Sequence, residues 1–376
     1  MKLLLTLLLP VITACSIDRV ADSAVENEAT GANPLQAKYS LDGLEVTLRD
    51  GRIDMPAAPG SASKITVAAL GPPVYGDLDG DQDMDAGLIL VYQGGGSGTF
   101  YYLAAALAYD GAYRGTNAVL LGDRIIPGLV RIQNRTIVTD FLDREASQSF
   151  SATPTVSVSR YAFLDGDELI AVAQDRVQSG WLTSGHEVRS YQPCGADEEL
   201  WVLGQSPALS EIKSTYSQLM RGAHVYAPLF VTLAGGAVDP PQDGFGASYD
   251  GAFFAERLLD VKRTGNCRDA LITVQTPLPG AVIESPLTIR GRARGSWFFE
   301  GDFPILLKDA DGKIIARSFV TAASEWMTTD FVDFLGSLSF TSPKRGSRGT
   351  LVFVKDNPSD RAELDDSTAI PVFFAD

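Results

Sequence analysis

Short runs of strand-forming residues, each followed by a turn signal, fill most of this chain. Residues 64–67, 87–92, 99–103 and 136–138 are rich in β-branched and aromatic side chains, which favour strands. Asp-Gly pairs such as Asp110-Gly111 recur between such runs and favour tight turns. The sequence therefore predicts a mainly β fold with many short connections.

Helical spacing is clear only in residues 207–220, where four apolar side chains fall on one face: Leu209, Ile212, Tyr216 and Leu219. Such a stripe is more often buried in a core than exposed to a partner. The alanine-rich residues 103–109 permit a second, shorter helix.

The chain is too long for one small core, because it has 376 residues. Turn signals and composition divide it into a β-rich amino-terminal module (residues 38–173), a small β-rich module (186–270) and a carboxy-terminal module (273–376). We therefore expect a mainly β, multi-domain protein.

The amino terminus has the features of an export signal. Lys2 gives a cationic start, and a leucine-rich apolar run ends at Ala14. This run is shorter than the roughly 18 apolar residues that a spanning helix needs, so residues 1–14 are predicted to be a signal peptide. Residues 12–15, Ile-Thr-Ala-Cys, resemble the lipobox of bacterial lipoproteins. The resemblance implies a mature chain that starts at Cys15 and carries fatty acyl groups such as palmitate. The alternative is an ordinary secretory signal that leaves Cys15 as a thiol.

The segment after the cysteine, residues 15–37, is polar and has no periodicity. It is predicted to be a flexible tether with a reach on the order of 25 Å. Ser16 rather than Asp follows the cysteine, which favours the periplasmic face of the outer membrane over retention at the inner membrane.

With Cys15 acylated, two cysteines remain, Cys194 and Cys267. An even pair in an exported protein most simply forms one disulfide. The alternative is a catalytic or metal-binding Cys/His pair that uses His186. The chain has only two histidines, and neither has the spacing of a metal ligand pair, so the disulfide is favoured.

Acidic side chains outnumber basic ones by 47 to 31, and the formal net charge is −16. Such a surface repels phosphate backbones, so nucleic acid is not an expected partner. The charge is compatible with binding of metal cations, and with an envelope protein or a glycan as partner. The membrane is the partner that the lipid anchor implies.

Aspartates occupy alternate positions in residues 77–85: Asp77, Asp79, Asp81, Asp83 and Asp85. This alternation turns oxygen atoms inward, and calcium takes 6–8 oxygen ligands. The segment resembles the calcium loops between strands of integrin-type propeller repeats. The resemblance implies four carboxylate ligands and Asp83 through its carbonyl, with Gln82 in place of a usual Gly. Calcium would be a structural clamp here; the alternative is a solvated acidic turn.

The carboxy-terminal module carries several separated motifs. Residues 277–280, 285–293, 295–301, 326–327, 331–334, 354–359 and 370–374 resemble the immunoglobulin-like domain associated with bacterial spore germination proteins. The resemblance covers residues 273–376 and implies a β-sandwich with a binding or scaffolding role outside the cytoplasm. Independently, residues 309–312 (Asp-Ala-Asp-Gly) between two apolar runs predict a hairpin. Strands at this spacing suit a sandwich of about 100 residues.

Three adjacent aromatic residues stand in this module: Trp297, Phe298 and Phe299. Core packing is the favoured interpretation, because aromatic rings carry much of the area of a core. An exposed aromatic ledge for a glycan or protein partner is the alternative.

The middle module resembles the OB-like domain of outer-membrane lipoproteins tied to copper tolerance and envelope-stress sensing. The residues concerned are 191–195, Trp201 and 225–235. The resemblance implies a small β-barrel. The Cys-x-x-Cys motif that metal handling would favour is absent from the sequence, so copper binding does not follow.

Nothing in the sequence matches the usual hydrolase motifs: Gly-x-Ser-x-Gly, Ser-x-x-Lys with its partner motifs, and His-Glu-x-x-His are all absent. We therefore expect no enzyme, but a lipid-anchored envelope protein with non-catalytic binding or scaffolding modules. Paired carboxylates need no motif, so an acidic-site hydrolase of envelope polymers is the alternative. A third hypothesis is an envelope-stress sensor.

Overall fold

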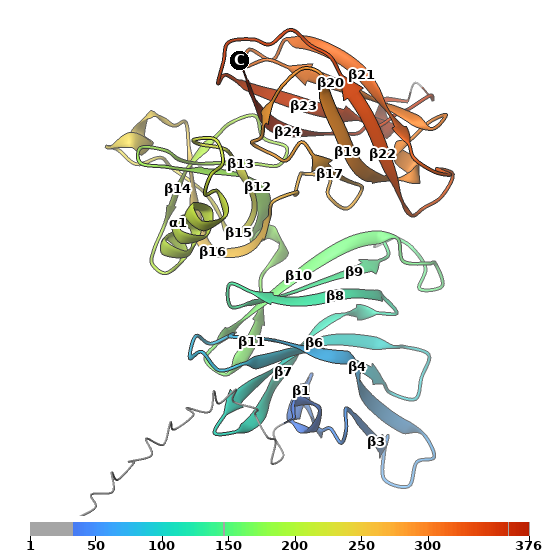
Figure 1. Ribbon diagram of the computed structural model, residues 1–376. Helices are drawn as coiled ribbons and strands as arrows, with labels where there is room; N and C mark the ends of the chain where they lie inside the picture. Colours follow the sequence, from blue (N-terminus) through green and yellow to red (C-terminus); the bar gives the residue numbers. More distant parts are fainter. Residues whose placement is uncertain (1–32, 146, 360, 376) are drawn as a thin grey trace, which may run out of the picture.

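The computed structural model describes residues 33–145, 147–359 and 361–375, which form three β-rich modules in succession (Figure 1). The predicted signal peptide and Cys15 lie outside the described residues. Among the helices of the described residues, none has the length and apolar character needed to cross a membrane.

The first module is built on a sheet of seven strands in the order β2-β1-β7-β6-β5-β4-β3. β1 and β7 are parallel, and the other neighbours are antiparallel. The strands are β1 (Lys38–Leu41), β2 (Leu44–Thr47), β3 (Arg52–Pro56), β4 (Lys64–Gly76), β5 (Asp85–Gln93), β6 (Phe100–Tyr109) and β7 (Ala112–Asp123).

A second sheet of four strands, in the order β11-β10-β9-β8, covers one face of the first sheet. Its strands are β8 (Ile126–Gln133), β9 (Thr136–Asp143), β10 (Val156–Asp165) and β11 (Glu168–Ala171). Ile89 and Leu103 face this sheet and pack in one core with Ile137, whereas Leu88 and Leu90 face the opposite core. β5 and β6 are therefore buried on both faces.

This double burial corrects the prediction of a short helix over residues 103–109, which lie in β6. Their alanines alternate between the two cores, Ala104 and Ala106 on one side and Ala105 on the other. Small side chains are used here because both faces of the strand are covered, and local helix propensity is overridden by this packing.

The predicted tether is also shortened. The 3-10 helix η1 (Pro34–Gln36) and Ala37 belong to the folded body, because Pro34 and Ala37 are buried. The Tyr39 hydroxyl donates a hydrogen bond to the Pro34 carbonyl (2.7 Å).

The middle module is a closed barrel in the order β12-β13-β14-β16-β15. Its elements are β12 (Val177–Ser184), β13 (Arg189–Pro193), β14 (Leu200–Gly204), α1 (Ala208–Leu219), β15 (Leu229–Val238) and β16 (Ala252–Lys262). α1 lies between the third and fourth strands of the barrel, and β14 pairs with β16 in parallel. The closed barrel agrees with the small β-barrel predicted for this module.

The boundary predicted at His186 is wrong, because the first barrel strand starts at Val177. Gly180 interrupts the strand pattern in this segment. The barrel requires glycine there because a Cβ would collide with the backbone carbonyl of Gln192 on β13.

The predicted helix is confirmed as α1. Ile212 and Tyr216 are buried in the barrel core, and Leu209 and Leu219 pack against it. The Tyr216 hydroxyl donates to the Ala227 carbonyl (2.7 Å), which ties the helix to the segment before β15.

The third module is a sandwich whose strands follow the order β17-β19-β22-β21-β20-β23-β24-β18. Inward and outward side chains alternate regularly along β19, β20 and β23, as expected for strands with one buried face. The predicted hairpin at residues 309–312 joins β20 to β21. The strands are β17 (Ile272–Thr276), β18 (Val282–Ile283), β19 (Leu287–Arg294), β20 (Asp302–Lys308), β21 (Ile314–Ala322), β22 (Phe331–Leu338), β23 (Arg348–Val354) and β24 (Ser367–Phe374).

Candidate functional site

The acidic loop, residues 77–84, joins β4 to β5, and its backbone is turned by its own aspartates. Asp77 accepts a hydrogen bond from the Gly80 N–H (2.5 Å), and Asp81 accepts one from the Asp83 N–H (2.8 Å). Gly80 and Gln82 have φ of 93° and 78°. Gln82 therefore adopts the left-handed conformation that glycine would adopt more easily.

Asp85, the first residue of β5, forms the buried floor of this loop. Its side chain is 0% exposed. Its two oxygens accept hydrogen bonds from the N–H groups of Leu78 (2.8 Å) and Ala108 (2.9 Å). Leu78 is buried in the core between the two sheets, so the loop is fixed both to β6 and to that core.

Three of the five predicted ligands converge. Asp77, Asp79 and Asp85 each have a carboxylate oxygen within 4.8 Å of the others. Oxygen ligands at calcium distance lie at most about 5 Å from one another, so this spacing fits a single cation. The structure leaves Asp81 and Asp83 outside the group, with exposed side chains. The carboxylate of Asp81 instead supports the backbone turn at Asp83.

The carboxylates of the loop are electrostatically strained. Burial raises the pKa of the Asp85 carboxyl, although its two hydrogen bonds act in the opposite direction. Burial also raises the pKa of the Asp79 carboxyl, and the neighbouring charges of Asp81 and Asp77 raise it further. A divalent cation would relieve these unfavourable interactions.

One cationic side chain reaches the loop from another sheet. Asn134 and Arg135 form the tip of the β8–β9 hairpin, with φ of 49° and 54°. The Arg135 guanidinium packs against Gly80 so closely that a Cβ at Gly80 would clash with it. The loop and this hairpin are therefore in direct contact.

Cys194 and Cys267 form a disulfide, as the sequence predicts, with a Cα–Cα distance of 5.5 Å. Cys194 follows β13, and Cys267 lies between β16 and β17, at the junction of the barrel with the third module. Both cysteines pack against the core of the third module. This core continues into the barrel, where it includes Trp181 and Phe230. The Cys/His alternative is thereby excluded for this pair.

Further contacts join the barrel to the third module, among them an ion pair between Arg348 of β23 and Glu199 (2.7 Å). The Asn266 side chain is buried, accepts a hydrogen bond from the Thr368 hydroxyl (2.9 Å) and donates one to the Ile272 carbonyl (2.9 Å). The His224 ring stacks on Phe373 of β24 at 3.9 Å.

The first junction, between the amino-terminal module and the barrel, is centred on a buried carboxylate. Asp260 of β16 is 2% exposed and pairs with Arg131 of β8 (2.8 Å). It also accepts hydrogen bonds from the Gln133 side chain and from the Val261 N–H. Lys262 lies 3.8 Å from the same carboxylate. A small apolar cluster surrounds this network: Val138, Tyr161, Val172, Ala234 and Leu259.

Core packing, the favoured interpretation of the three adjacent aromatic residues, is confirmed for two of them, and the alternative of an exposed ledge is wrong for these two. Trp297 and Phe298 are 1% and 4% exposed and belong to the core of the third module, where Phe298 packs on Phe303. These two rings cannot contact a ligand, because the sandwich covers them. Phe299 is 38% exposed.

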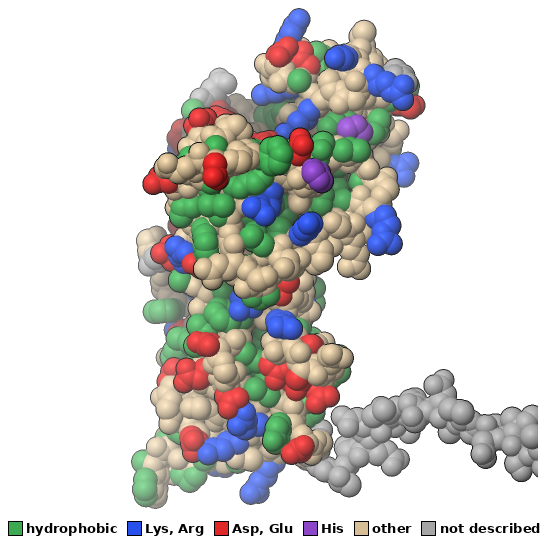
Figure 2. Space-filling model, turned by 90° about the vertical axis from the view of Figure 1, so that its left-hand side faces the viewer, with side chains coloured by type: hydrophobic (Ala, Val, Ile, Leu, Met, Phe, Trp, Pro, Cys, Tyr) green, Lys and Arg blue, Asp and Glu red, His purple; other side chains and the backbone are tan. Residues whose placement is uncertain are grey.

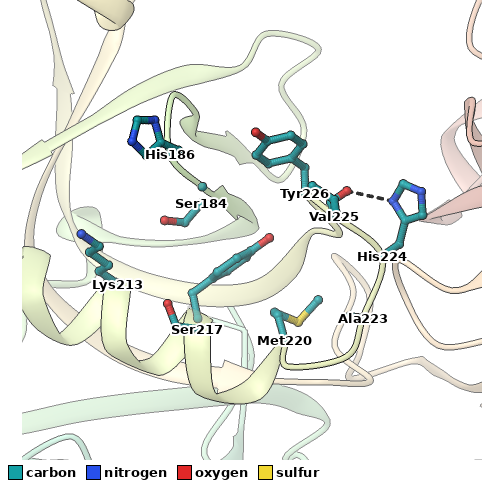
Figure 3. Close-up of a pocket in the computed structure, with 11 residues that line it drawn as sticks. Ser184, His186, Lys213, Ser217, Met220, Ala223, His224, Val225 and Tyr226 are labelled. Atoms are coloured by element: carbon teal, nitrogen blue, oxygen red, sulfur yellow. Dashed lines mark hydrogen bonds between the residues drawn. The ribbon is translucent and has the colours of Figure 1, made fainter.

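The barrel also has a hollow on its surface that no sequence pattern predicts. It has a volume of about 560 Å³, and both histidines of the chain, His186 and His224, line it together with Lys213 (Figure 3). The two histidines come from different loops, so no sequence spacing could have brought them together.

These observations define a class: a β protein of several modules, with a disulfide at one junction and a carboxylate-lined loop in its first module. The family model described as the immunoglobulin-like domain of bacterial spore germination matches residues 271–362. This confirms the prediction of an immunoglobulin-like third module. Neither the search among curated proteins nor the search among solved structures gave a match.

Proposed function

We propose that this chain is a lipid-anchored protein of the bacterial cell envelope whose modules bind or scaffold other molecules and catalyse no reaction. The observation that carries the proposal is the Cys194–Cys267 disulfide at the junction of the barrel and the immunoglobulin-like module. Disulfides persist in oxidising compartments outside the cytoplasm. The lipobox resemblance at Cys15 supplies the attachment, and Ser16 favours the outer membrane.

The continuity of the modules supports a scaffolding role. One core runs from the immunoglobulin-like module into the barrel, and a buried ionic network joins the barrel to the first module. A body packed in this way presents its surfaces in a fixed arrangement to an envelope protein or a glycan.

The strand order of the barrel also supports the resemblance of residues 186–270 to the OB-like domain of copper-tolerance and envelope-stress lipoproteins. We propose common architecture with that domain and no copper site.

We further propose that the acidic loop holds calcium as a structural clamp. The convergence of Asp77, Asp79 and Asp85 supports this, as do the raised pKa values of the Asp79 and Asp85 carboxyls. The remaining ligands that calcium requires would come from the loop backbone and water.

The test of the proposal combines fractionation with an activity screen. Mass spectrometry of the amino-terminal peptide should show acyl mass on Cys15, and Cys15→Ala should release the protein from outer-membrane fractions. A screen against envelope glycans should show no turnover. An unmodified amino-terminal peptide would contradict the anchor. Turnover abolished by one Asp or Glu substitution would replace the binding role with hydrolysis.

A further inference from the structure

The hollow that contains both histidines continues into a second one on the same side of the barrel. The volumes are about 560 and 300 Å³, and the two share Ser184, Gly185, His186 and Lys213 as a common wall. Together they form one groove, here called the basic groove, between the β12–β13 loop and α1. Figure 2 shows the two histidines near each other on this face, among lysine, arginine and hydrophobic side chains, with an acidic side chain beside one of them.

The charge of the basic groove is opposite to that of the chain. Lys213, Arg189 and the two histidines line it, and no carboxylate of the described residues does. The chain as a whole has 47 acidic and 31 basic side chains. Glu187 and Glu211 lie on the same elements as His186 and Lys213, yet they line neither hollow. The ionisable side chains that line the groove are therefore basic, with tyrosines as the other titratable groups.

Arg189 is the strongest sign that an anion belongs there. Its Nε donates to the Val202 carbonyl (2.7 Å), and its guanidinium lies 5.0 Å from the centre of the Trp201 ring. No ion pair to Arg189 is found among the described residues. Burial lowers its pKa, with no carboxylate acting in the opposite direction. A half-buried cation without a counter-charge is unfavourable, and a bound anion would compensate it.

The other residues that line the groove include hydroxyl groups and an aromatic ring, to which sugar rings can bind. Hydroxyl groups come from Ser184, Ser210 and Ser217, and Phe245 presents an exposed aromatic face. Tyr226 stands on the far side of the hollow from Lys213 (Figure 3).

The Tyr226 backbone has φ of 61°, which is unfavourable for a bulky side chain. Its ring is held against Gly185, where a Cβ would collide with it. Strained residues of this kind are concentrated at binding sites.

We propose that the basic groove binds a short acidic oligosaccharide, with a sugar carboxylate or phosphate between Lys213, His186 and Arg189. The size of the hollows is in the range of small-ligand sites. A long polyanion is disfavoured because the rest of the surface is acidic. The inference rests on the proposed role of the chain as an envelope binding protein and names the ligand class of its middle module.

The test uses calorimetry on the exported chain carrying Cys15→Ala. The probes are a uronic-acid tetrasaccharide, a phosphorylated tetrasaccharide and a neutral tetrasaccharide. An acidic probe should bind at least tenfold more tightly than the neutral one, and high salt should weaken its binding. The two acidic probes distinguish a carboxylate from a phosphate ligand.

Lys213→Glu should weaken binding of the acidic probe at least tenfold. The matched control is Lys313→Glu, the same charge reversal on an exposed residue of the β20–β21 hairpin, which should leave binding unchanged. Melting curves of both variants report on folding.

Equal affinity for the acidic and neutral probes would overturn the proposal, as would the absence of binding at millimolar probe. Equal losses of affinity in the two variants would also contradict it. A single-stranded oligonucleotide serves as a fourth probe, and its tighter binding would exclude an acidic oligosaccharide as the ligand. The measurement does not depend on the lipid. A negative calorimetry result would not affect the proposed lipid anchor at Cys15. A negative fractionation result would not affect the proposed ligand of the basic groove.

Discussion

The two junctions of this molecule are held by different chemistry. Between the first module and the barrel, a buried carboxylate, Asp260, collects hydrogen bonds and ion pairs from Arg131, Gln133 and Lys262. Between the barrel and the immunoglobulin-like module, a disulfide lies beside a continuous apolar core. The second junction also has an ion pair, Arg348–Glu199 (2.7 Å), but its side chains are partly exposed to solvent. The second junction should therefore be less sensitive to salt and pH than the first, which depends on a buried carboxylate and loses stability when one partner is removed.

The position of the tryptophans allows the two junctions to be followed separately. All four, Trp181, Trp201, Trp297 and Trp326, lie in the barrel or the immunoglobulin-like module. Tryptophan fluorescence thus reports on those two modules, while far-UV circular dichroism reports on all three.

The largest effect is expected from loss of the disulfide. The Cys194→Ala, Cys267→Ala variant should lose about 3–4 kcal/mol of unfolding free energy, because the bond closes a long loop in the unfolded chain. Urea unfolding followed by tryptophan fluorescence measures the loss. Cys15→Ala is the control and should behave as wild type. A loss below about 1 kcal/mol would mean that the apolar core alone holds this junction.

Asp260→Ala should cost about 2 kcal/mol, less than the full penalty for a buried pair because its partners are partly exposed to solvent. The first module should then unfold separately, so that the dichroism and fluorescence transitions in urea no longer coincide. Glu256→Ala is the matched control. It removes a carboxylate of the same strand whose pairing with Arg176 is solvent-exposed, and it should change stability by less than about 0.5 kcal/mol. Coincident transitions in Asp260→Ala would show that the polar junction contributes little.

Calcium should stabilise the first module alone. At tenfold excess over its dissociation constant, a single bound ion adds about 1.4 kcal/mol. In the Asp260→Ala variant, whose first module is expected to unfold separately, the shift should appear in the melting curve by dichroism and not in that by fluorescence. The double variant Asp79→Ala, Asp81→Ala should show no calcium-induced shift. No heat of binding and no shift at millimolar calcium would end the metal hypothesis.

The smallest effect is a pH dependence in calcium-free buffer. The folded state raises the pKa of the Asp79 carboxyl, so the charged form is disfavoured in the fold. Asp79→Asn should therefore gain on the order of 0.5 kcal/mol at pH 7. The gain should disappear as pH falls below the ordinary Asp range, where wild type is also neutral. Asn retains the oxygen that accepts the Asp81 N–H, so the turn survives. A gain that is constant with pH would exclude this electrostatic origin.

Local patterns were enough to predict the β class, the helix α1, the disulfide and the immunoglobulin-like module. They failed where the decisive partner lies far away in sequence. Residues 103–109 form a strand because both of its faces are buried in cores. Gly180 interrupts the sequence pattern of the strand β12, and the reason for this glycine is the close approach of β13. Arg131 and Asp260 meet across 129 residues, and the histidines of the basic groove come from separate loops.

The three modules also lie in chain order along the molecule, with η1 near the end opposite the immunoglobulin-like module (Figure 1). If the chain is attached to lipid at Cys15, modules later in the sequence lie farther from the lipid surface. The first module would then stand nearest the headgroups. The basic groove would then stand farther from the lipid, where polymers too bulky to approach the bilayer could still reach it. The immunoglobulin-like module would stand farthest from the lipid.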